Sequence, residues 1–339
     1  MKIFKIVLAE LGITKEQLQD KEIQKFIYDY IARKYTGQWI QWKNGNAIIE
    51  INKNNGTSIR TILDDEDYNP EFPENIDMNI STYCENNCSF CYEGCNKRGK
   101  HADIKKFIND KNSFLYTLHE GSELALNGNE PLHPDLELLL KFCKERNILA
   151  NLTVQENTLI KHKEQIEKLL DDKLIHGIGI SPCQYSDDLI NFCKNYPTAV
   201  IHTIAGITTM EQYQKLMDQD LKILILGYKD FGRGITYASK HNETIDTLIK
   251  DLSTNLKDFP NHFKVVSFDN LAIEQLDVKS ILTQEQWETF YRGSDGNHTL
   301  YVDLVRETFA KNSIQPKENR KALLNDIRDM LKVIHDDNI

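Results

Sequence analysis

From about residue 75 the sequence alternates between short apolar runs of strand length and longer stretches with helical spacing. Six strand candidates follow one another: Ile76–Ser81, Glu123–Asn127, Ile148–Gln155, Ile175–Ser181, Ala199–Ile204 and Lys222–Gly227. Segments of helix length, such as Pro134–Arg146 and Leu159–Leu170, lie between them. Strands that each lead into a helix predict a parallel sheet with helices packed against it, and therefore an α/β fold.

Two arrangements fit this alternation, an open doubly wound sheet and a partial or full (β/α) barrel. In both, ligands gather at the carboxyl ends of the strands. We expect residues 75–270 to form this core, because the alternation fades beyond residue 260. Residues 271–339 are expected to form a mixed extension, a candidate lid, that ends in an amphipathic helix. The apolar stripe of that helix comprises Leu323, Leu324, Ile327, Leu331 and Ile334.

Residues 1–70 show a different pattern. Thr14 and Gln17 have the spacing of a capping box, and apolar residues at helical spacing follow. The pairs Asn44-Gly45 and Asn55-Gly56 are typical of tight hairpin turns. The pattern predicts a helix followed by a three-stranded antiparallel unit, a candidate for substrate recognition. Its strands are expected near Gln38–Lys43, Ala47–Lys53 and Thr57–Leu63.

The charge balance limits the classes of partner. The 339 residues include 41 Lys and Arg and 51 Asp and Glu, which gives a formal net charge of −10. This argues against a broad basic surface for duplex DNA, although a local basic groove remains compatible with it. No apolar run approaches the roughly 18 residues that a membrane span requires. We therefore expect a cytoplasmic protein with no membrane partner.

Seven cysteines are present, and four of them lie between residues 84 and 95. Cys84, Cys88 and Cys91 are separated by three and two residues, so one loop can bring their thiolates together. A zinc site usually takes its remaining ligands from a second, distant pair, and the sequence has no distant Cys-x-x-Cys. A [4Fe-4S] cluster held by only three cysteines leaves one iron open to an exogenous ligand. The spacing therefore favours an iron–sulfur site over a zinc site.

This Cys-x3-Cys-x2-Cys segment, with aromatic Phe90 before the third cysteine, resembles the signature of the radical S-adenosylmethionine (SAM) superfamily. Its position after the first strand of a (β/α) series fits as well, and the resemblance covers roughly residues 75–270. It implies a partial (β/α)6 TIM-like barrel with a single [4Fe-4S] cluster on Cys84, Cys88 and Cys91. It also implies that Phe90 lies near bound SAM.

A second segment supports the resemblance. Asn127 is followed by Gly128, Asn129, Glu130 and Pro131, directly after the second predicted strand. These residues resemble the Gly-Gly-Glu-Pro segment of the superfamily, which implies that they bind the amino group of SAM. Asn129 replaces the second glycine, and asparagine is the residue other than glycine that best tolerates a left-handed backbone.

Polar residues at later strand ends are weaker candidates. Gln155 ends the third predicted strand and Ser181 ends the fourth. The resemblance implies that these residues contact SAM, with Ser181 near its ribose, whereas ordinary strand-end polar residues are the alternative. Lys229 and Arg233 follow the sixth strand, where either could grip a substrate or lie in a solvated loop.

The resemblance implies an enzyme that takes one electron from an external, flavodoxin- or ferredoxin-like reductant. SAM is then cleaved reductively to a 5′-deoxyadenosyl radical, which abstracts a hydrogen atom from the substrate. Two other classes stay open, an iron–sulfur electron carrier or sensor and a structural zinc protein. No further cysteine follows Cys193, so a second cluster is not expected.

The substrate is predicted from the N-terminal unit. Its edge strands can pair with an extended chain, which favours a peptide or protein substrate. The alternative is a nucleotide or a nucleic-acid base. In that case Trp39, Trp42 and Lys43 would stack on and grip a single strand, and Lys229 and Arg233 would contact phosphate.

Overall fold

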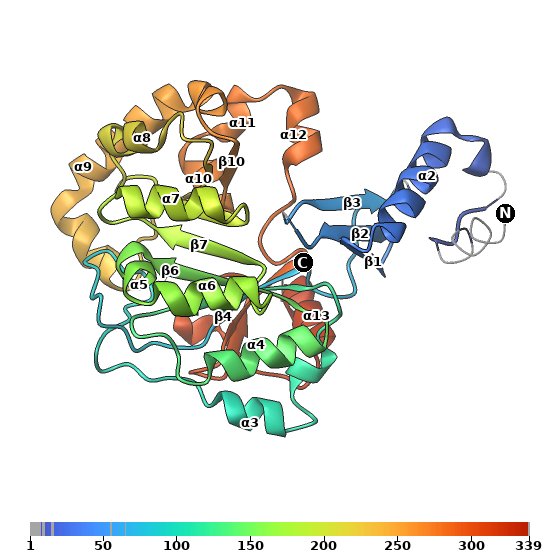
Figure 1. Ribbon diagram of the computed structural model, residues 1–339, viewed down its shortest axis with the longest axis horizontal. Helices are drawn as coiled ribbons and strands as arrows, with labels where there is room; N and C mark the ends of the chain where they lie inside the picture. Colours follow the sequence, from blue (N-terminus) through green and yellow to red (C-terminus); the bar gives the residue numbers. More distant parts are fainter. Residues whose placement is uncertain (1–7, 9–10, 15–16, 55, 65, 338–339) are drawn as a thin grey trace. The chain divides into compact units, whose positions relative to one another are not determined.

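In the computed structural model the chain divides into two units, Met1–Phe72 and Pro73–Ile339 (Figure 1). The structure describes residues 8, 11–14, 17–54, 56–64 and 66–337. Part of the predicted N-terminal unit, including Asn55 of the second predicted turn, therefore lies outside the described residues. No helix in the described ranges is both long enough and apolar enough to cross a membrane.

The first unit consists of a helix and a three-stranded antiparallel sheet in the order β1-β2-β3. Its elements are η1 (Gln17–Gln19), α2 (Lys21–Tyr35), β1 (Trp39–Asn44), β2 (Ala47–Asn52) and β3 (Ser58–Ile62). The turn between β1 and β2 requires glycine, because Gly45 has φ +58° and a Cβ atom there would lie 1.7 Å from the Asn69 carbonyl oxygen. The strands lie where the sequence predicts them.

The predicted capping box at Thr14 forms, but it does not start the long helix. The Thr14 N–H donates to Gln17 Oε1 at 2.8 Å, and the Gln17 N–H donates to Thr14 Oγ1 at 3.3 Å. These bonds lead only into the short η1. A second cap follows at Asp20, whose carboxylate accepts the Glu22 N–H at 2.7 Å, so α2 begins at Lys21.

The second unit is built on a ten-stranded sheet in the order β10-β9-β8-β7-β6-β5-β4-β11-β12-β13. All neighbouring strands are parallel except β11 with β12 and β12 with β13, which are antiparallel. The fold is therefore α/β with a mostly parallel sheet. The strands are β4 (Asn75–Asn79), β5 (Glu123–Gly128), β6 (Leu149–Gln155), β7 (Gly177–Ser181), β8 (Ala199–Ile204), β9 (Lys222–Leu226), β10 (Val265–Phe268), β11 (Thr299–Asp303), β12 (Thr308–Ala310) and β13 (Lys321–Ala322).

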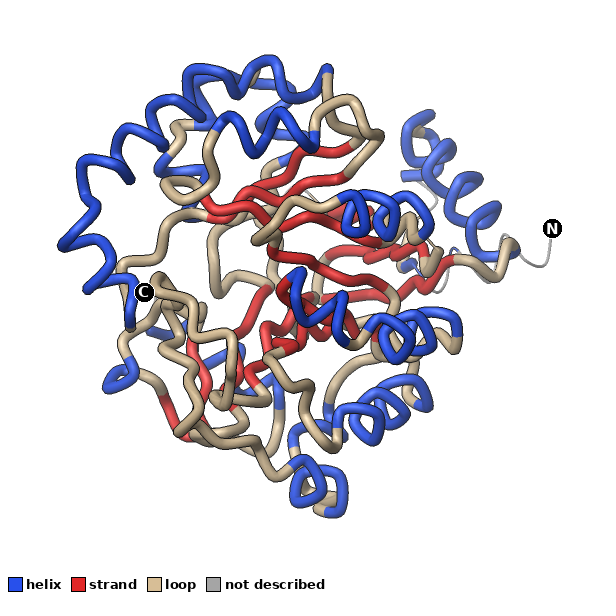
Figure 2. The backbone as a smooth tube through the Cα atoms, turned by 60° about the vertical axis from the view of Figure 1, so that its left-hand side comes forward, coloured by secondary structure: helices blue, strands red, loops and turns tan. Residues whose placement is uncertain are grey.

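From β4 to β10 each strand lies next to its successor in the chain, so the sheet is wound in a single direction. Because parallel crossovers are right-handed, the connecting helices fall on one face of the sheet. Figure 2 shows the strands enclosed by the helices. The helices are α3 (Ile104–Asn109), η2 (Phe114–Thr117), α4 (Leu136–Glu145), α5 (Glu156–Lys161), α6 (Lys163–Asp171), α7 (Asp187–Asn195), α8 (Met210–Leu216), α9 (Arg233–Asn255), η3 (Leu256–Asn261), α10 (Asn270–Gln275), α11 (Val278–Ile281), α12 (Gln284–Phe290), η4 (Lys317–Asn319) and α13 (Ile327–Asp337).

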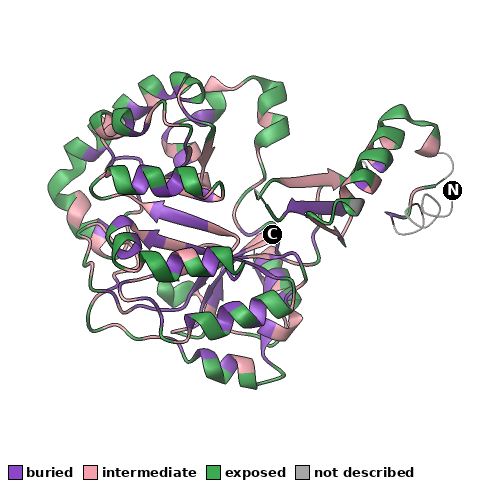
Figure 3. Cartoon of the chain, in the orientation of Figure 1, coloured by how far each residue is buried: buried purple, intermediate pink, exposed green. Residues whose placement is uncertain are grey.

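The two faces of this sheet differ in polarity. In strands such as β5, β6 and β9 alternate residues are apolar and buried, and Figure 3 shows the buried residues in purple. The other face, called the polar face below, carries side chains that strand alternation and register place together. It comprises Asp77, Asn127, Asn151, Thr153, Gln155, Ser181 and His202. A parallel sheet covered by helices on both faces would be apolar on both, so the polar face is the one available for ligands.

Three expectations need correction. The segment Leu159–Leu170 is two helices, α5 and α6, because the backbone leaves helical geometry at His162. The last helix, α13, begins only at Ile327, and Leu324 lies before it with 37% of its surface exposed. The strands after residue 260 were not predicted, because β10 has four residues and β12 and β13 have three and two.

Candidate functional site

The cysteine loop, residues 84–95, leaves the carboxyl end of β4. Its first thiol, Cys84, is buried, and those of Cys88 and Cys91 are half-buried. Local hydrogen bonds fold the loop into tight turns, since the Cys91 N–H donates to the Cys88 carbonyl at 3.3 Å and the Gly94 N–H donates to that of Cys91 at 3.1 Å. These turns bring residues that are separated along the chain to one end of the sheet.

The polar face contacts this loop through Gln155, the last residue of β6. The Gln155 side-chain N–H donates to Cys88 Sγ at 3.3 Å. Burial raises the pKa of the Cys88 thiol, and the neighbouring thiols of Cys91 and Cys84 raise it further. The sulfurs of Cys84 and Cys91 therefore both lie within electrostatic range of Cys88.

A fourth thiol, Cys95, lies against Cys91. Hydrogen bonding with Cys95 lowers the pKa of Cys91 to about 6, although burial opposes that shift. The interaction with Cys91 raises the pKa of Cys95, and burial adds to the effect. Cys91 is therefore the more acidic thiol of the pair, and the Cys95 thiol donates to the Ser81 carbonyl at 3.9 Å.

Arg233 is the first residue of α9, the helix that follows β9, and it binds the cysteine loop. Its Nε donates to the Cys88 carbonyl and its Nη1 to the Cys95 carbonyl, both at 2.8 Å. Its backbone N–H donates to the Cys91 carbonyl at 3.1 Å. Gly232 allows this approach, because it has φ +54° and a Cβ atom there would lie 2.2 Å from the Tyr92 carbonyl oxygen.

The segment from Asn127 to Pro131 also contacts the backbone that leads into the cysteine loop. The Asn127 side-chain N–H donates to the Ser81 carbonyl at 2.8 Å. The Asn129 side chain donates to the same carbonyl at 2.7 Å and to the Tyr83 carbonyl at 2.9 Å. Asn129 does not adopt positive φ. Asn129 thus contributes through the hydrogen bonds of its side-chain amide, and not through a left-handed backbone conformation.

Gly128 and Pro131 complete this turn. A Cβ atom on Gly128 would lie 2.6 Å from Val154 Cγ1 and 2.8 Å from the Thr153 carbonyl oxygen, so β5 and β6 leave no room there for a side chain. The peptide bond between Glu130 and Pro131 is cis. The Glu130 carbonyl accepts the Glu85 N–H at 2.7 Å, which fixes the turn to the cysteine loop.

The carboxylate of Glu130 is buried, with 6% of the residue exposed. It forms an ion pair with Lys161 and accepts a hydrogen bond from His162 Nε2 at 3.1 Å. Burial alone would raise the pKa of Glu130, but the hydrogen bonds from Lys161 and His162 outweigh it and hold the pKa below its ordinary value. Glu130 is therefore ionised at neutral pH.

The two remaining predicted residues are Ser181 and Phe90. Ser181 is the register neighbour of Gln155 on the polar face. The ring of Phe90 packs edge-on against Tyr237 of α9, with 5.9 Å between ring centroids. The structure therefore brings Gln155 into contact with a cysteine, sets Ser181 beside it, and directs Phe90 toward α9.

A cluster of charged groups lies further along the polar face around Lys229. Its ammonium lies 4.4 Å from the centroid of the Tyr92 ring, 3.5 Å from Ser313 Oγ and 3.9 Å from Asp269 Oδ2. Burial raises the pKa of Asp77, and the positive charge of Lys229 opposes that rise. Burial and, to a smaller extent, the charge of Lys229 lower the pKa of His202 to about 4, so His202 is neutral at neutral pH.

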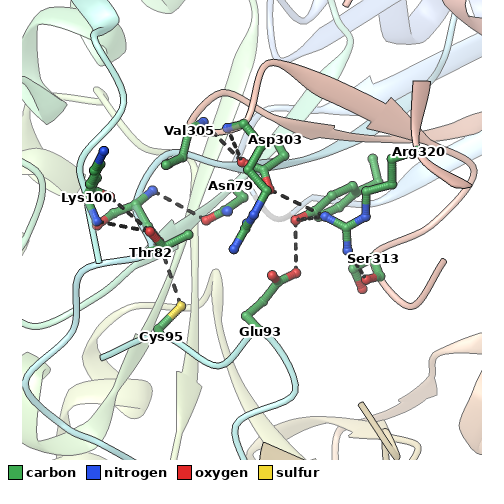
Figure 4. A network of polar contacts seen from close by, with 12 residues as sticks. Asn79, Thr82, Glu93, Cys95, Lys100, Asp303, Val305, Ser313 and Arg320 are labelled. Carbon is green, nitrogen blue, oxygen red and sulfur yellow. Dashed lines mark hydrogen bonds and ion pairs between the residues drawn. The ribbon is translucent and has the colours of Figure 1, made fainter. Parts of the chain in front are cut away.

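The C-terminal strands contact the cysteine loop through Glu93. The Tyr301 hydroxyl donates to Glu93 Oε1 at 2.9 Å, and Arg320 donates to the Tyr301 oxygen at 3.2 Å and to Asp303 Oδ2 at 3.4 Å (Figure 4). Asn79 is 4% exposed, and its Nδ2 has no hydrogen-bond partner among the described residues. Residues 299–320 thus form part of the same site as the cysteines.

The arrangement of the thiols bears on which metal group they could hold. Within the described ranges, no three His, Cys, Asp or Glu side chains gather closely enough to hold a single metal ion. A cubane cluster sets a different requirement, because each thiolate binds a different iron and the sulfurs stay apart. The donor set fits this requirement, since it offers three neighbouring thiols on one loop and a lowered pKa at Cys91.

The sequence does not predict two contributions to the site. Arg233 was considered for contact with a substrate, but its side chain binds the cysteine loop. Glu156 is fully buried and accepts hydrogen bonds from four consecutive backbone N–H groups at residues 183–186. It thereby fixes the loop that follows Ser181. A glutamate directly after a strand-end glutamine is the only hint of this role in the sequence.

In comparisons with known proteins, no family model matches this chain and no curated protein is significantly similar to it in sequence. The resemblance to the radical SAM superfamily therefore rests on the two short segments and on the geometry around them.

Proposed function

We propose that this protein is a radical SAM enzyme that carries one [4Fe-4S] cluster. The observation that supports it best is the contact of three separate segments at the carboxyl ends of β4, β5 and β6. Cys88 accepts a hydrogen bond from Gln155, and Asn129 binds the backbone that leads to Cys84. Ligands of α/β proteins bind at this end of a sheet.

The proposed fold is a partial TIM-like (β/α) barrel in which β4 to β10 would be seven consecutive strands, one more than the (β/α)6 arrangement expected from the sequence. A sheet wound in one direction supports it, because a doubly wound sheet would reverse its strand order and place helices on both faces. The polar face would then line the interior of the barrel. That arrangement would direct Gln155 and Ser181 toward the same enclosed space as the cysteine loop.

In this proposal Cys84, Cys88 and Cys91 hold the cluster, which would supply the electron that cleaves the sulfonium bond of SAM to methionine and a 5′-deoxyadenosyl radical. Ionised Glu130 provides the acceptor that the amino group of SAM needs, within the turn formed by Gly128, Asn129 and Pro131. Cys95 is not counted as a ligand in this proposal, and its thiol donates to the Ser81 carbonyl at 3.9 Å.

The chain's own residues would orient SAM and keep water away from it. Phe90 covers the loop on the side of α9, where it packs against Tyr237. Gln155 fixes the position of Cys88, and Ser181 offers a hydroxyl one register position away for the ribose. Exclusion of water and of stray hydrogen donors is what the protein contributes, because the cofactors supply the difficult chemistry.

The test is anaerobic reconstitution of the full chain with iron and sulfide. We expect roughly four irons per chain, as a [4Fe-4S] cluster requires, and formation of 5′-deoxyadenosine that depends on a reductant. Cys84→Ala, Cys88→Ala and Cys91→Ala should each lose the cluster, whereas Cys95→Ala should keep it. Zinc bound in place of iron would refute the proposal, and an intact cluster that never cleaves SAM would favour an electron carrier.

We propose a peptide or protein as the substrate. In the described part of the first unit, β1 and β3 each pair only with β2, so each presents an outer edge. Such edges bind extended chains through main-chain hydrogen bonds. The rings considered for stacking on a nucleic-acid base are less available, because Trp42 is buried and Trp39 lies beneath the Arg33 guanidinium at 5.6 Å.

A further inference from the structure

A short basic segment follows the cysteine loop directly. The Gly99 N–H donates to the Asn96 carbonyl at 3.0 Å, so Lys97 and Arg98 are the two central residues of a four-residue turn. Lys100 comes next, and the three cationic side chains, called the basic turn below, are exposed. None of the three forms an ion pair with another described residue, whereas the nearby Lys105 and Lys106 are neutralised by carboxylates.

The backbone of this turn is attached to the strand end that carries Cys84. The Cys84 N–H donates to the Asn96 carbonyl at 3.1 Å, and the Thr82 N–H donates to the Lys100 carbonyl at 2.9 Å. A Cβ atom on Gly99 would lie 1.9 Å from the Thr82 carbonyl oxygen, so only glycine permits this close packing. Figure 4 shows Lys100 beside Thr82, with its ammonium end turned away from Cys95. The backbone on both sides of the basic turn is therefore hydrogen-bonded to the segment that carries Cys84.

A recess of about 420 Å³ lies between the turn and the cysteine loop, lined by Asn87, Asn96, Lys97 and Arg98. Asn87 has φ +47° and directly precedes Cys88, so the recess reaches the cysteine loop. The two acidic residues of that loop are engaged elsewhere. Glu85 accepts from the Tyr83 hydroxyl at 2.8 Å, and Glu93 accepts from the Tyr301 hydroxyl at 2.9 Å. The recess is lined by two cationic side chains, Lys97 and Arg98, in a chain whose net charge is −10.

We propose that the basic turn is the docking surface for an acidic one-electron carrier protein of the flavodoxin or ferredoxin class. This inference rests on the proposed function, because only a redox site beneath the turn needs such a partner. One electron leaves the reduced carrier and enters the site held by the cysteine loop, and no atom is transferred. Opposite charges at a rim accelerate the encounter and set its orientation, which a transient electron donor requires.

A nucleic acid is the other polyanion that this surface could attract. Three cations favour the carrier, because single-stranded nucleic acids bind along extended basic grooves that also carry open aromatic rings. The aromatic ring next to the turn, Tyr83, packs against His101 with 5.5 Å between centroids. Its edge is thus occupied by a neighbouring ring.

The experiment compares charge reversal in the basic turn with the same change elsewhere. The test variant is Lys97→Glu/Arg98→Glu/Lys100→Glu in the full, reconstituted chain. The matched control reverses the charge of three exposed lysines. Two of them precede the amino-terminal ends of β9 and β10, which are opposite to the carboxyl ends, and the third lies on α9. These are Lys215, Lys250 and Lys257.

The measurements are binding of purified flavodoxin and formation of 5′-deoxyadenosine with either reduced flavodoxin or dithionite. We expect the test variant to bind flavodoxin at least about tenfold more weakly and to lose the flavodoxin-driven rate by a similar factor. Its iron content and its dithionite-driven rate should equal those of the wild type, because dithionite needs no docking surface. The control variant should behave as the wild type.

The other outcomes would overturn either the docking proposal or the proposed function. Wild-type flavodoxin binding by the test variant would overturn the proposal, and so would an equal loss in the control, since net charge alone would then explain it. If the test variant loses only the binding of a single-stranded oligonucleotide, the turn is a nucleic-acid surface and the proposal is wrong. If dithionite yields no 5′-deoxyadenosine with the wild type, the proposed function fails, while the binding measurements still decide on the docking surface.

Discussion

Replacement of Arg233 tests how the cysteine loop is held. Arg233→Met keeps an unbranched stem of similar length and removes both side-chain hydrogen bonds, to the carbonyls of Cys88 and Cys95. A hydrogen bond from a charged donor contributes about 1.5–3 kcal/mol. Because Arg233 is half-buried and water can replace part of each bond, we expect the pair to stabilise the closed loop by about 1.5–3 kcal/mol in total.

The assay is thiol alkylation of the cluster-free protein, followed by peptide mass spectrometry. Cys95 is buried, with 6% of its surface exposed, so it reacts only when the loop opens. A stabilisation of that size corresponds to labelling of Cys95 that is roughly 10- to 100-fold faster in Arg233→Met. Cys143 is fully buried on α4 and serves as the internal control for global unfolding.

Arg233→Lys is the matched variant. A lysine keeps the positive charge but cannot bond two carbonyls with the planar geometry of a guanidinium, so an effect between those of the wild type and Arg233→Met is expected. If Cys95 reacts at the wild-type rate in Arg233→Met, the reasoning is refuted. Equal acceleration at Cys95 and Cys143 would refute it as well, because the effect would then be global.

Two further predictions concern the turn after β5 and the substrate. Glu130→Gln should lower the free energy of unfolding by about 1 kcal/mol at pH 7. Because the folded pKa of Glu130 is lowered, its contribution is present above the unfolded value near 4.5 and is lost as the pH falls through the folded value. Urea unfolding of both proteins should therefore converge in acid, and a difference that persists there would contradict the ion-pair explanation. A peptide that the reconstituted protein modifies should bind with little dependence on salt between about 50 and 500 mM, whereas a steep loss would favour a nucleic-acid substrate.

The sequence predicts most of the parallel sheet because its strands have a strong local signal. Ala199–Ile204 matches β8 at both ends, since it is a short apolar run with a helix on either side. The same rule fails for β11, whose residues Thr299–Asp303 pair with β4 across more than two hundred positions. Its residues have strand propensity, but its place beside β4 depends on that distant partner and is not indicated by the neighbouring sequence.

The same contrast between local signals and contacts of distant residues applies to the candidate site. The spacing of Cys84, Cys88 and Cys91 is local, so the sequence is sufficient to single them out. The hydrogen bonds from Arg233 and the pairing of Glu130 with Lys161 join residues that lie far apart in the chain. From the sequence alone, Arg233 and Lys161 fit solvated surface residues equally well, because the neighbouring residues do not indicate what either side chain contacts.

The pairing of β4 with β11 has a consequence for synthesis of the chain. Ribosomes add about 5–20 residues per second, so β11 emerges on the order of ten seconds or more after β4. Until then one edge of β4 lacks its strand neighbour, and Glu93 lacks the Tyr301 hydroxyl that later binds it. The cysteine loop is thus synthesised early, but its hydrogen bond with Tyr301 forms late. The nascent chain passes through a period in which its thiols are more open than in the folded protein, and that period ends only when β11 has been added.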